Sequence, residues 1–104
     1  MAFTQTIALR AKSADEIISL LDEWQREEAD VAPGYQAGRL MADLDHPDRF
    51  IIEVDFSSKE EADRNNDRPE TQRWAERMRS IAQGEPEYYN YEVVHTAESA
   101  HASH

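Results

Sequence analysis

The chain has 104 residues, the size of one compact domain with a real core, and its 22 acidic and 11 basic residues give a formal charge of −11. This acidic excess repels phosphate backbones and anionic membrane surfaces, and no apolar run approaches the ~18 residues of a membrane helix, so we expect a cytoplasmic protein with neither nucleic acid nor membrane as a partner. The absence of cysteine excludes disulfides, thiolate metal sites, iron–sulfur clusters and a cysteine nucleophile.

The first two elements are a strand and a helix. Residues 2–11, AFTQTIALRA, alternate weakly between apolar and polar side chains and predict a strand. Ser13 and Glu16 then form a capping-box pattern, which is followed by apolar residues at helical spacing. We expect the first helix at about residues 14–30, with a Pro-Gly pair to stop it.

A hairpin follows. Residues 35–44 and 49–56 flank DHPD, a cluster of turn-forming residues, and this arrangement predicts two antiparallel strands. In the second strand, alternate positions from Phe50 to Phe56 are all apolar, whereas the other phase is mixed. We therefore expect the apolar phase to pack against helices.

A second helix begins after this hairpin and is broken in its middle. Ser57 and Ser58 start two overlapping capping boxes. Pro69 interrupts the helix, because proline lacks the amide hydrogen and disfavours helical geometry in the residue before it. The helix resumes there and ends near Gly84, and within it Trp74 shares an inward face with apolar residues spaced three and four apart.

The last predicted element is a strand, which completes a βαββαβ order of elements. Residues 86–96, PEYYNYEVVHT, predict a strand, and the tail 97–104 lacks periodicity, so we expect it to be flexible. The order βαββαβ predicts an α+β ferredoxin-like fold in a single domain of residues 1–96: a four-stranded antiparallel sheet with two helices on one face. The other sheet face is too apolar to be purely solvated, so we expect a face-to-face homodimer.

Motifs of the common enzyme classes are missing from the sequence. There is no P-loop and no GxGxxG, the four histidines lack ligand spacing, and the serines stand where helix caps are needed. We therefore expect neither a metal nor a cofactor of those kinds.

The remaining candidate site is a set of aromatic and polar residues that only the fold can bring together. Aromatic walls with a few polar groups are typical of a pocket for a small aromatic molecule, although the same residues also make a good core. The residues expected between the helices and the sheet are Trp24, Phe50, Phe56, Trp74, Met78, Tyr91 and His95.

Three polar residues are candidates for chemistry. His95 would be a general base if it faced inward, but a histidine with satisfied hydrogen bonds near a strand end is the commoner case. Arg39 would neutralise an enolate or phenolate. Asn66, next to Asn65 at the break in the second helix, would orient a carbonyl group or simply cap the helix.

Residues 33–78, from PGYQAGRL to RWAERM, and residues 85–94, EPEYYNYEVV, resemble the antibiotic biosynthesis monooxygenase-like group of the dimeric α+β barrel superfamily. The shared features are the Pro-Gly before the second strand, the Asp-Pro turn of the hairpin and the last strand. The resemblance implies a homodimer with a pocket between sheet and helices in each subunit. Some members of the group oxidise phenolic polyketides to quinones with O2 and without metal or flavin, and one branch binds haem.

The sequence departs from this group at a few positions. Oxidising members tend to have tryptophan at the end of the third strand, where Phe56 stands here, and asparagine on the first strand, where Gln5 and Thr6 are nearest. Trp74 stands where the haem-binding branch has its axial histidine, and tryptophan does not ligate iron.

The resemblance as a whole implies a cofactor-independent monooxygenase of a small aromatic or polyketide-like substrate. The alternative is a non-catalytic small-molecule-binding or structural dimer.

Overall fold

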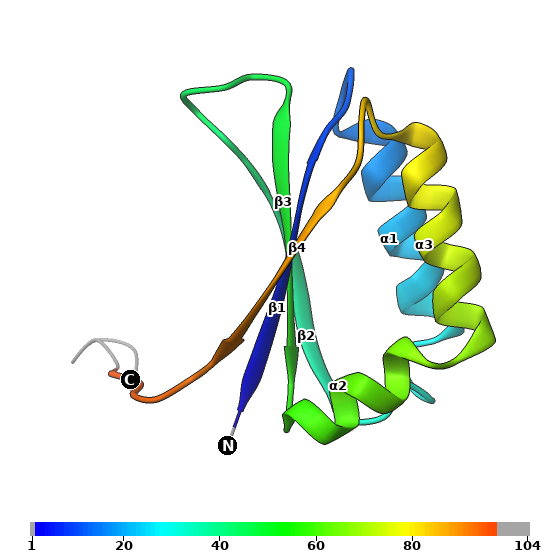
Figure 1. Cartoon of the computed structure of the whole chain (residues 1–104). Helices are drawn as coiled ribbons and strands as arrows, with labels where there is room; N and C mark the ends of the chain where they lie inside the picture. The colour runs from blue at the N-terminus through cyan, green and yellow to red at the C-terminus, as the bar shows by residue number, and fades with distance from the viewer. Residues whose placement is uncertain (1, 98–104) are drawn as a thin grey trace.

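The structure, a computed structural model, describes residues 2–97 and consists of one antiparallel sheet with helices on one face (Figure 1). The strand order is β2-β3-β1-β4, and the predicted α+β ferredoxin-like plan is confirmed. The elements are β1 (Phe3–Arg10), α1 (Asp15–Glu27), β2 (Tyr35–Ala42), β3 (Arg49–Phe56), α2 (Lys59–Asn66), α3 (Pro69–Ile81) and β4 (Glu87–Glu92).

Local signals explain where the helices begin. Ser58 caps α2 as predicted, because its side chain accepts a hydrogen bond from the backbone N–H of Glu61 at 3.2 Å. Pro69 stands at the start of α3, so the interruption of the second helix is complete and yields two separate helices. The predicted cap at Ser13 is wrong, since α1 begins one residue later, with Ala14 at the cap position and no side-chain capping bond.

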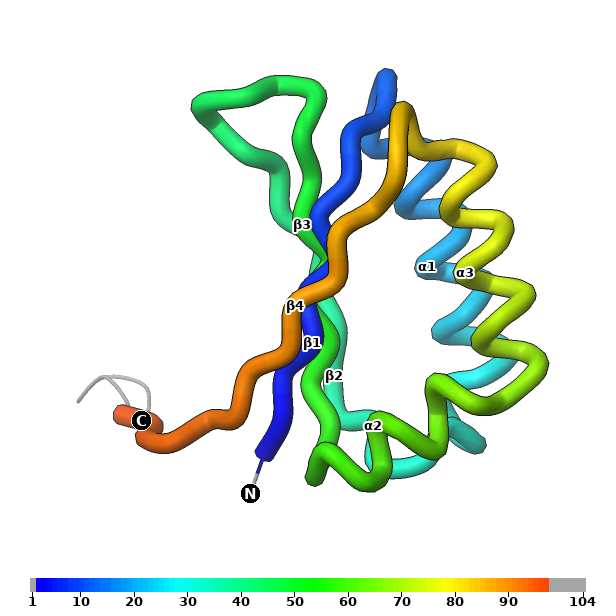
Figure 2. The backbone as a smooth tube through the Cα atoms, in the orientation of Figure 1, coloured from blue at the N-terminus to red at the C-terminus, as the bar shows by residue number. Residues whose placement is uncertain are grey.

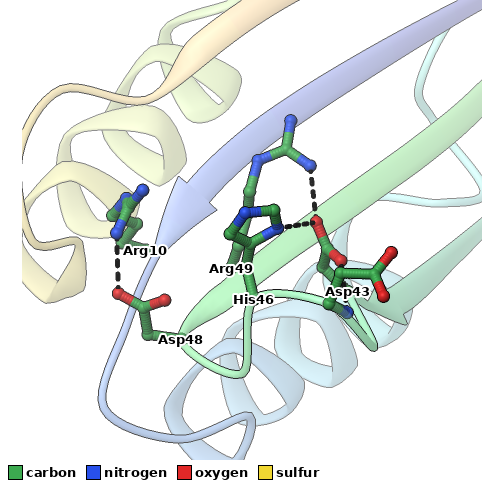
Figure 3. A network of polar contacts seen from close by, with 6 residues as sticks. Arg10, Asp43, His46, Asp48 and Arg49 are labelled. Carbon is green, nitrogen blue, oxygen red and sulfur yellow. Dashed lines mark hydrogen bonds and ion pairs between the residues drawn. The ribbon is translucent and has the colours of Figure 1, made fainter.

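Ion pairs hold the turn between β2 and β3 (Figure 3). Asp43 accepts a hydrogen bond from Arg49 at 3.0 Å and lies 3.3 Å from the ring nitrogen Nδ1 of His46. Arg10, at the end of β1, pairs with Asp48 at 3.0 Å. These contacts tie the turn to the neighbouring strand, which gives His46 a structural place in the fold.

A register shift in β2 changes which side chains face the helices. Leu40 packs against the core, and simple alternation from it would put Gln36 on the same face. The pairing with β3 shifts between Tyr35 and Ala37, which leaves Gln36 as the extra residue of a β-bulge. Tyr35 consequently stands opposite Phe56 and points toward the helices.

The structure reverses the predicted facing of β4. Ile7, buried on the helix side of β1, stands opposite Tyr88, so Tyr88 shares its face, whereas Tyr91 lies in the opposite phase. The strand also ends at Glu92, and His95 lies exposed beyond it. The predicted placement of Tyr91 and His95 between helices and sheet is therefore wrong. Aromatic residues occur in both phases of this strand, so the sequence pattern could not select the buried one.

The core fills only part of the space between the helices and the sheet. Ile17, Phe50, Ile52 and Met78 belong to one cluster of buried side chains that joins α1, α3 and the sheet. A second, smaller cluster of Phe3, Phe56 and Ala62 lies under α2. Figure 2 shows the two long helices running side by side over the sheet, with α2 at one end.

Three further predictions concern membranes, metals and the tail. None of the described helices is both long and apolar enough to cross a membrane. Within residues 2–97, no group of three or more histidine and acidic side chains is arranged to hold a metal ion. The tail predicted at 97–104 lies outside the described residues from residue 98 onward.

Candidate functional site

A cavity of about 530 Å³ lies between the sheet and the helices. This volume is within the range of small-molecule sites, about 300–1,000 Å³. Several of its lining side chains, among them Ile18 and Gln72, are exposed, so the cavity opens to solvent. Its aromatic lining consists of Trp24, Tyr35, Phe56, Trp74 and Tyr88.

Three of these aromatic side chains form a continuous wall. The rings of Trp24 and Tyr35 meet edge to face, with centroids 4.7 Å apart and an interplanar angle of 73°. Tyr35 and Phe56 make a second edge contact at 6.4 Å with the same angle. Such pairs contribute about 0.5–1.5 kcal/mol each beyond the area they bury. The wall is thus held in place by its own contacts.

Trp74 belongs to both the core and the cavity. Its ring packs against the buried cluster that contains Ile17 and Met78 and also lines the cavity. Its indole N–H donates a hydrogen bond to the backbone carbonyl of Leu20 at 3.2 Å, which ties α3 to α1. Because its one donor is used in this way, Trp74 presents an apolar surface to the cavity.

Polar groups gather where α2 meets α3. Asn65 is buried, with 4% of its surface exposed, and it lines the cavity together with Asn66 and Thr71. The side-chain oxygen of Asn65 accepts hydrogen bonds from the Thr71 hydroxyl at 3.1 Å and from the Arg68 guanidinium at 3.3 Å. The orientation of this amide is therefore fixed.

The two tyrosines of the lining remain neutral phenols. Tyr35 donates a hydrogen bond to the side-chain oxygen of Gln25 at 3.0 Å, and burial, followed by the charge of Asp55, raises the pKa of its hydroxyl. Burial likewise raises the pKa of Tyr88, against the opposing effect of Arg79. Both hydroxyls are therefore protonated at neutral pH, and the one proton of the Tyr35 hydroxyl is donated to Gln25.

The structure brings some of the predicted site residues together. Trp24, Phe56, Trp74 and Asn66 all line the cavity, as expected. The remaining two apolar candidates, Phe50 and Met78, belong to the adjacent core.

The other polar candidates lie apart from the cavity interior. Arg39 borders the cavity, but its side chain is exposed and pairs with Glu53 at 3.0 Å. His95 is exposed beyond the end of β4, and Tyr91 is on the sheet face away from the helices. Of the three predicted catalytic residues, Asn66 is therefore the one that lines the cavity without belonging to an ion pair among the described residues.

The chemistry available inside the cavity is that of hydrogen-bond donors. Among the residues of the described chain that line it, Asp22 is the one carboxylate, and it is exposed on α1. Within residues 2–97, no histidine lines it. The site can therefore hold a flat ring and polarise an oxygen atom, whereas a strong buried base is not part of this lining.

Two site residues, Tyr35 and Tyr88, were not recognised as such from the sequence. Tyr35 was hidden by the bulge in β2, and Tyr88 by the ambiguous phase of β4. Asn65 was visible as half of an Asn-Asn pair at a helix break, but only the structure shows that it is the more buried of the two.

Comparison with known proteins identifies the fold. No protein-family model matches the sequence, and no curated protein matches it. A variant of SnoaB, a cofactor-independent oxygenase from Streptomyces nogalater, superposes with a TM-score of 0.79 at 13% identity, over 94% of this chain and 98% of that one. Rv0793 from Mycobacterium tuberculosis gives 0.75 at 10% identity, over 94% and 100%.

A proposed antibiotic biosynthesis monooxygenase from Chloroflexus aurantiacus J-10-fl also matches, with a TM-score of 0.70 at 20% identity, over 94% of this chain and 98% of that one. The fold predicted from the resemblance in sequence is thus the fold of these proteins. At such identities the likeness establishes the fold, and a shared reaction does not follow from it.

Proposed function

We propose that this protein is a cofactor-independent monooxygenase that oxidises a small, flat aromatic substrate of polyketide type in the cavity. The observation that carries the proposal is the composition of the lining: the aromatic rings of Trp24, Trp74 and Phe56 together with the amides of Asn65 and Asn66. Aromatic walls hold a flat ring, and amide donors hold and polarise an oxygen on its edge. The likeness in fold to a cofactor-independent oxygenase supports the same reading.

Anthrone oxidation is the simplest reaction of this class. The methylene carbon of anthrone becomes the second carbonyl of anthraquinone, taking one oxygen atom of O2, and the other oxygen atom leaves as water. That carbon loses four electrons and O2 accepts four, so the reaction balances without an external reductant. Such chemistry needs an enzyme that binds the enolate of the substrate and admits O2.

Asn66 has a specific part in this proposal. When the methylene proton leaves, negative charge moves to the carbonyl oxygen of the substrate, and an amide N–H near that oxygen stabilises the charge. Since the described residues of the lining include no histidine, we propose that the proton passes to solvent through the open side of the cavity. The electron-rich enolate then reacts with O2 directly.

Oxygen uptake with anthrone in aerated buffer tests the proposal. We expect one O2 consumed per anthraquinone formed, with no added metal, flavin or nicotinamide. Ala75 lines the cavity on α3, and its neighbour Glu76 is exposed. Ala75→Phe fills the cavity and should abolish uptake, whereas Glu76→Phe adds the same ring outside and should leave it unchanged. Equal rates for the two variants, or a rate no higher than that of heat-inactivated protein, would contradict the proposal.

A non-catalytic binding protein is the second candidate. The observation in its favour is that the part of the lining formed by residues 2–97 has no histidine, and its one carboxylate, Asp22, is exposed. Such a protein would bind anthrone or anthraquinone and lose that binding in Ala75→Phe, yet show no oxygen uptake. The same pair of variants therefore separates the two functions.

We also propose that two copies pair through the open face of the sheet. Tyr91 is 52% exposed and Tyr89 43% exposed, and both lie in the phase of β4 that faces away from the helices. Exposed aromatic side chains of this kind on a sheet favour association. Light scattering should give about twice the 12.0 kDa chain mass, and Tyr91→Lys should lower it, whereas a 12.0 kDa species at micromolar concentration would contradict pairing.

A further inference from the structure

Asn65 has a feature that the proposed reaction does not require. Its side chain is buried, with 4% of its surface exposed, at the point where α2 ends and the chain turns into α3. Buried amides normally have partners for both the oxygen and the nitrogen. In Asn65 only the oxygen has partners: within the described residues, the contacts found are Thr71 at 3.1 Å and Arg68 at 3.3 Å.

The orientation of this amide follows from the chemistry of its neighbour. A guanidinium group has only donors, so the Asn65 atom that faces Arg68 must be the oxygen. The nitrogen then points away from Arg68. In the part of the chain described, every side-chain nitrogen or oxygen that is fully buried has a hydrogen-bond partner. The Asn65 nitrogen has no such partner there, so it must be exposed to accessible space. The accessible space that Asn65 lines is the cavity.

Arg68 is itself held firmly behind the cavity wall. Its side chain is 17% exposed and pairs with Glu28, at the end of α1, at 2.6 Å and with Glu70 at 3.2 Å. Arg68 is not among the residues that line the cavity. It acts on a ligand only through Asn65, by fixing which end of the amide faces inward, and is therefore a positioning residue.

The charges around this group determine what kind of oxygen it prefers. Glu28 and Glu70 carry two negative charges against the single positive charge of Arg68, so the cluster behind Asn65 has a net charge of −1. Arg39, which borders the cavity, is paired with Glu53. A ligand oxygen at Asn65 thus meets a neutral donor in a slightly negative surrounding, which disfavours a full negative charge at this position, whereas the enolate charge of the proposed reaction lies at Asn66.

We propose that Asn65, oriented by Arg68, is the recognition group for a neutral carbonyl oxygen on the edge of a flat aromatic ligand, and that the site discriminates against carboxylates. This inference rests on the proposed function for the flat ligand, and it adds the chemical group by which that ligand is selected. A ketone or quinone satisfies the free amide N–H, whereas a hydrocarbon of the same shape leaves it unpaired.

Quenching of tryptophan fluorescence measures the binding, because both tryptophans of the chain line the cavity. The probes are 1,4-naphthoquinone, naphthalene and 1-naphthoate, which share one ring system. Leaving a buried donor unpaired reduces affinity about ten-fold. We expect the quinone to bind about ten-fold more tightly than naphthalene and the carboxylate to bind more weakly than the quinone.

Asn65→Asp is the decisive variant. Aspartate keeps the shape and an oxygen for Thr71 and Arg68 but replaces the inward donor with an acceptor. Quinone affinity should fall at least ten-fold in this variant, while naphthalene affinity stays within two-fold. Arg68→Met should reduce the preference for quinone over naphthalene, and Arg68→Lys should restore part of it. Glu76→Phe, which changes an exposed residue of α3, serves as the control.

NMR spectra of the wild-type protein give a second test of the inference. This test does not require that the variants fold correctly. The side-chain N–H resonances of Asn65 should shift in NMR spectra on addition of the quinone and not of naphthalene. Unchanged resonances, an unchanged preference in Asn65→Asp, or equal binding of 1-naphthoate would overturn this inference. If instead none of the three probes binds, the proposed function fails as well, so the two failures are distinguishable.

Discussion

The two ends of the space between helices and sheet differ in how they are filled. At one end, which we call the packed end, Ile17, Leu20, Phe50 and Met78 interlock in a buried cluster. At the other, the hollow end, Trp24, Tyr35, Asn65 and Trp74 surround the cavity. The packed end has the closely fitted apolar side chains of an ordinary protein interior, whereas the side chains of the hollow end surround open space. The same two helices thus provide stability at one end and a site at the other.

The largest effect that separates the two ends is expected from adjacent isoleucines of α1. Ile17 is fully buried at the packed end, while Ile18 is 44% exposed at the rim of the cavity. Ile17→Ala should lower the free energy of unfolding by about 2–5 kcal/mol, because it leaves a cavity in a closed core. Ile18→Ala should lower it by about 1 kcal/mol or less. Urea denaturation of both variants checks this, and equal losses would contradict the division into two ends.

A glycine tests whether the hollow end is rigid. Gly34 has φ +68°, and a Cβ there would lie 2.4 Å from the Cβ of Glu61 on α2. Gly84 has φ +93° but open space around it. The left-handed backbone alone disfavours alanine by about 1–2 kcal/mol at both positions.

Gly34→Ala should therefore be clearly more destabilising than Gly84→Ala, with thermal unfolding as the measurement. The difference between the two losses of stability measures the effect of the close contact between Gly34, just before β2, and α2. A loss at Gly34 no larger than that at Gly84 would mean that α2 moves easily, and the wall of the cavity with it.

Trp74 lies where the two ends meet, so a mild substitution there should have an intermediate effect. Trp74→Phe removes the hydrogen bond to the Leu20 carbonyl, and the free energy of unfolding should fall by about 1 kcal/mol. Trp24→Phe keeps an aromatic edge beside Tyr35 and should be milder. Should Trp24→Phe prove the more damaging of the two, the assignment of Trp74 to the core would be wrong.

The smallest effect concerns alkaline pH and the hollow end alone. Burial raises the pKa of the Tyr35 hydroxyl in the folded state above its usual value of about 10. A phenol whose pKa is higher in the folded state than in the unfolded state contributes its full stabilisation at any pH below the unfolded-state pKa. That stabilisation is lost as the pH rises through the folded-state pKa. Stability should therefore fall less between pH 9 and 11 in Tyr35→Phe than in wild type. Parallel pH profiles by urea denaturation would argue against a buried phenol at this position.

Much of the fold could be predicted from the sequence because its signals are local. The apolar phase of β3 and the cap at Ser58 each depend on a few neighbouring residues, and the structure confirms both. The Pro69 break was also local and is confirmed, and it divides the helix completely.

The candidate site was less predictable, because it depends on strand register. A bulge at Gln36 brings Tyr35 into the cavity, and the pairing of Ile7 with Tyr88 turns Tyr91 to the opposite face. The first feature is a one-residue shift within β2, and the second is the choice between two registers of β4 that differ by one residue. A change of one residue in register exchanges the two faces of a strand. The prediction that His95 faces inward was wrong for a different reason, because β4 ends at Glu92, before it reaches His95.

The proposals above depend on the hollow end being a binding site and not a loosely packed part of the core. A crystal structure of the protein with 1,4-naphthoquinone would decide between these two possibilities. We expect the ring system to lie between Trp24, Trp74 and Phe56, with one quinone oxygen within hydrogen-bonding distance of the Asn65 side-chain nitrogen. A structure in which those aromatic rings close on one another and leave no space, or in which the quinone binds only elsewhere, would contradict it.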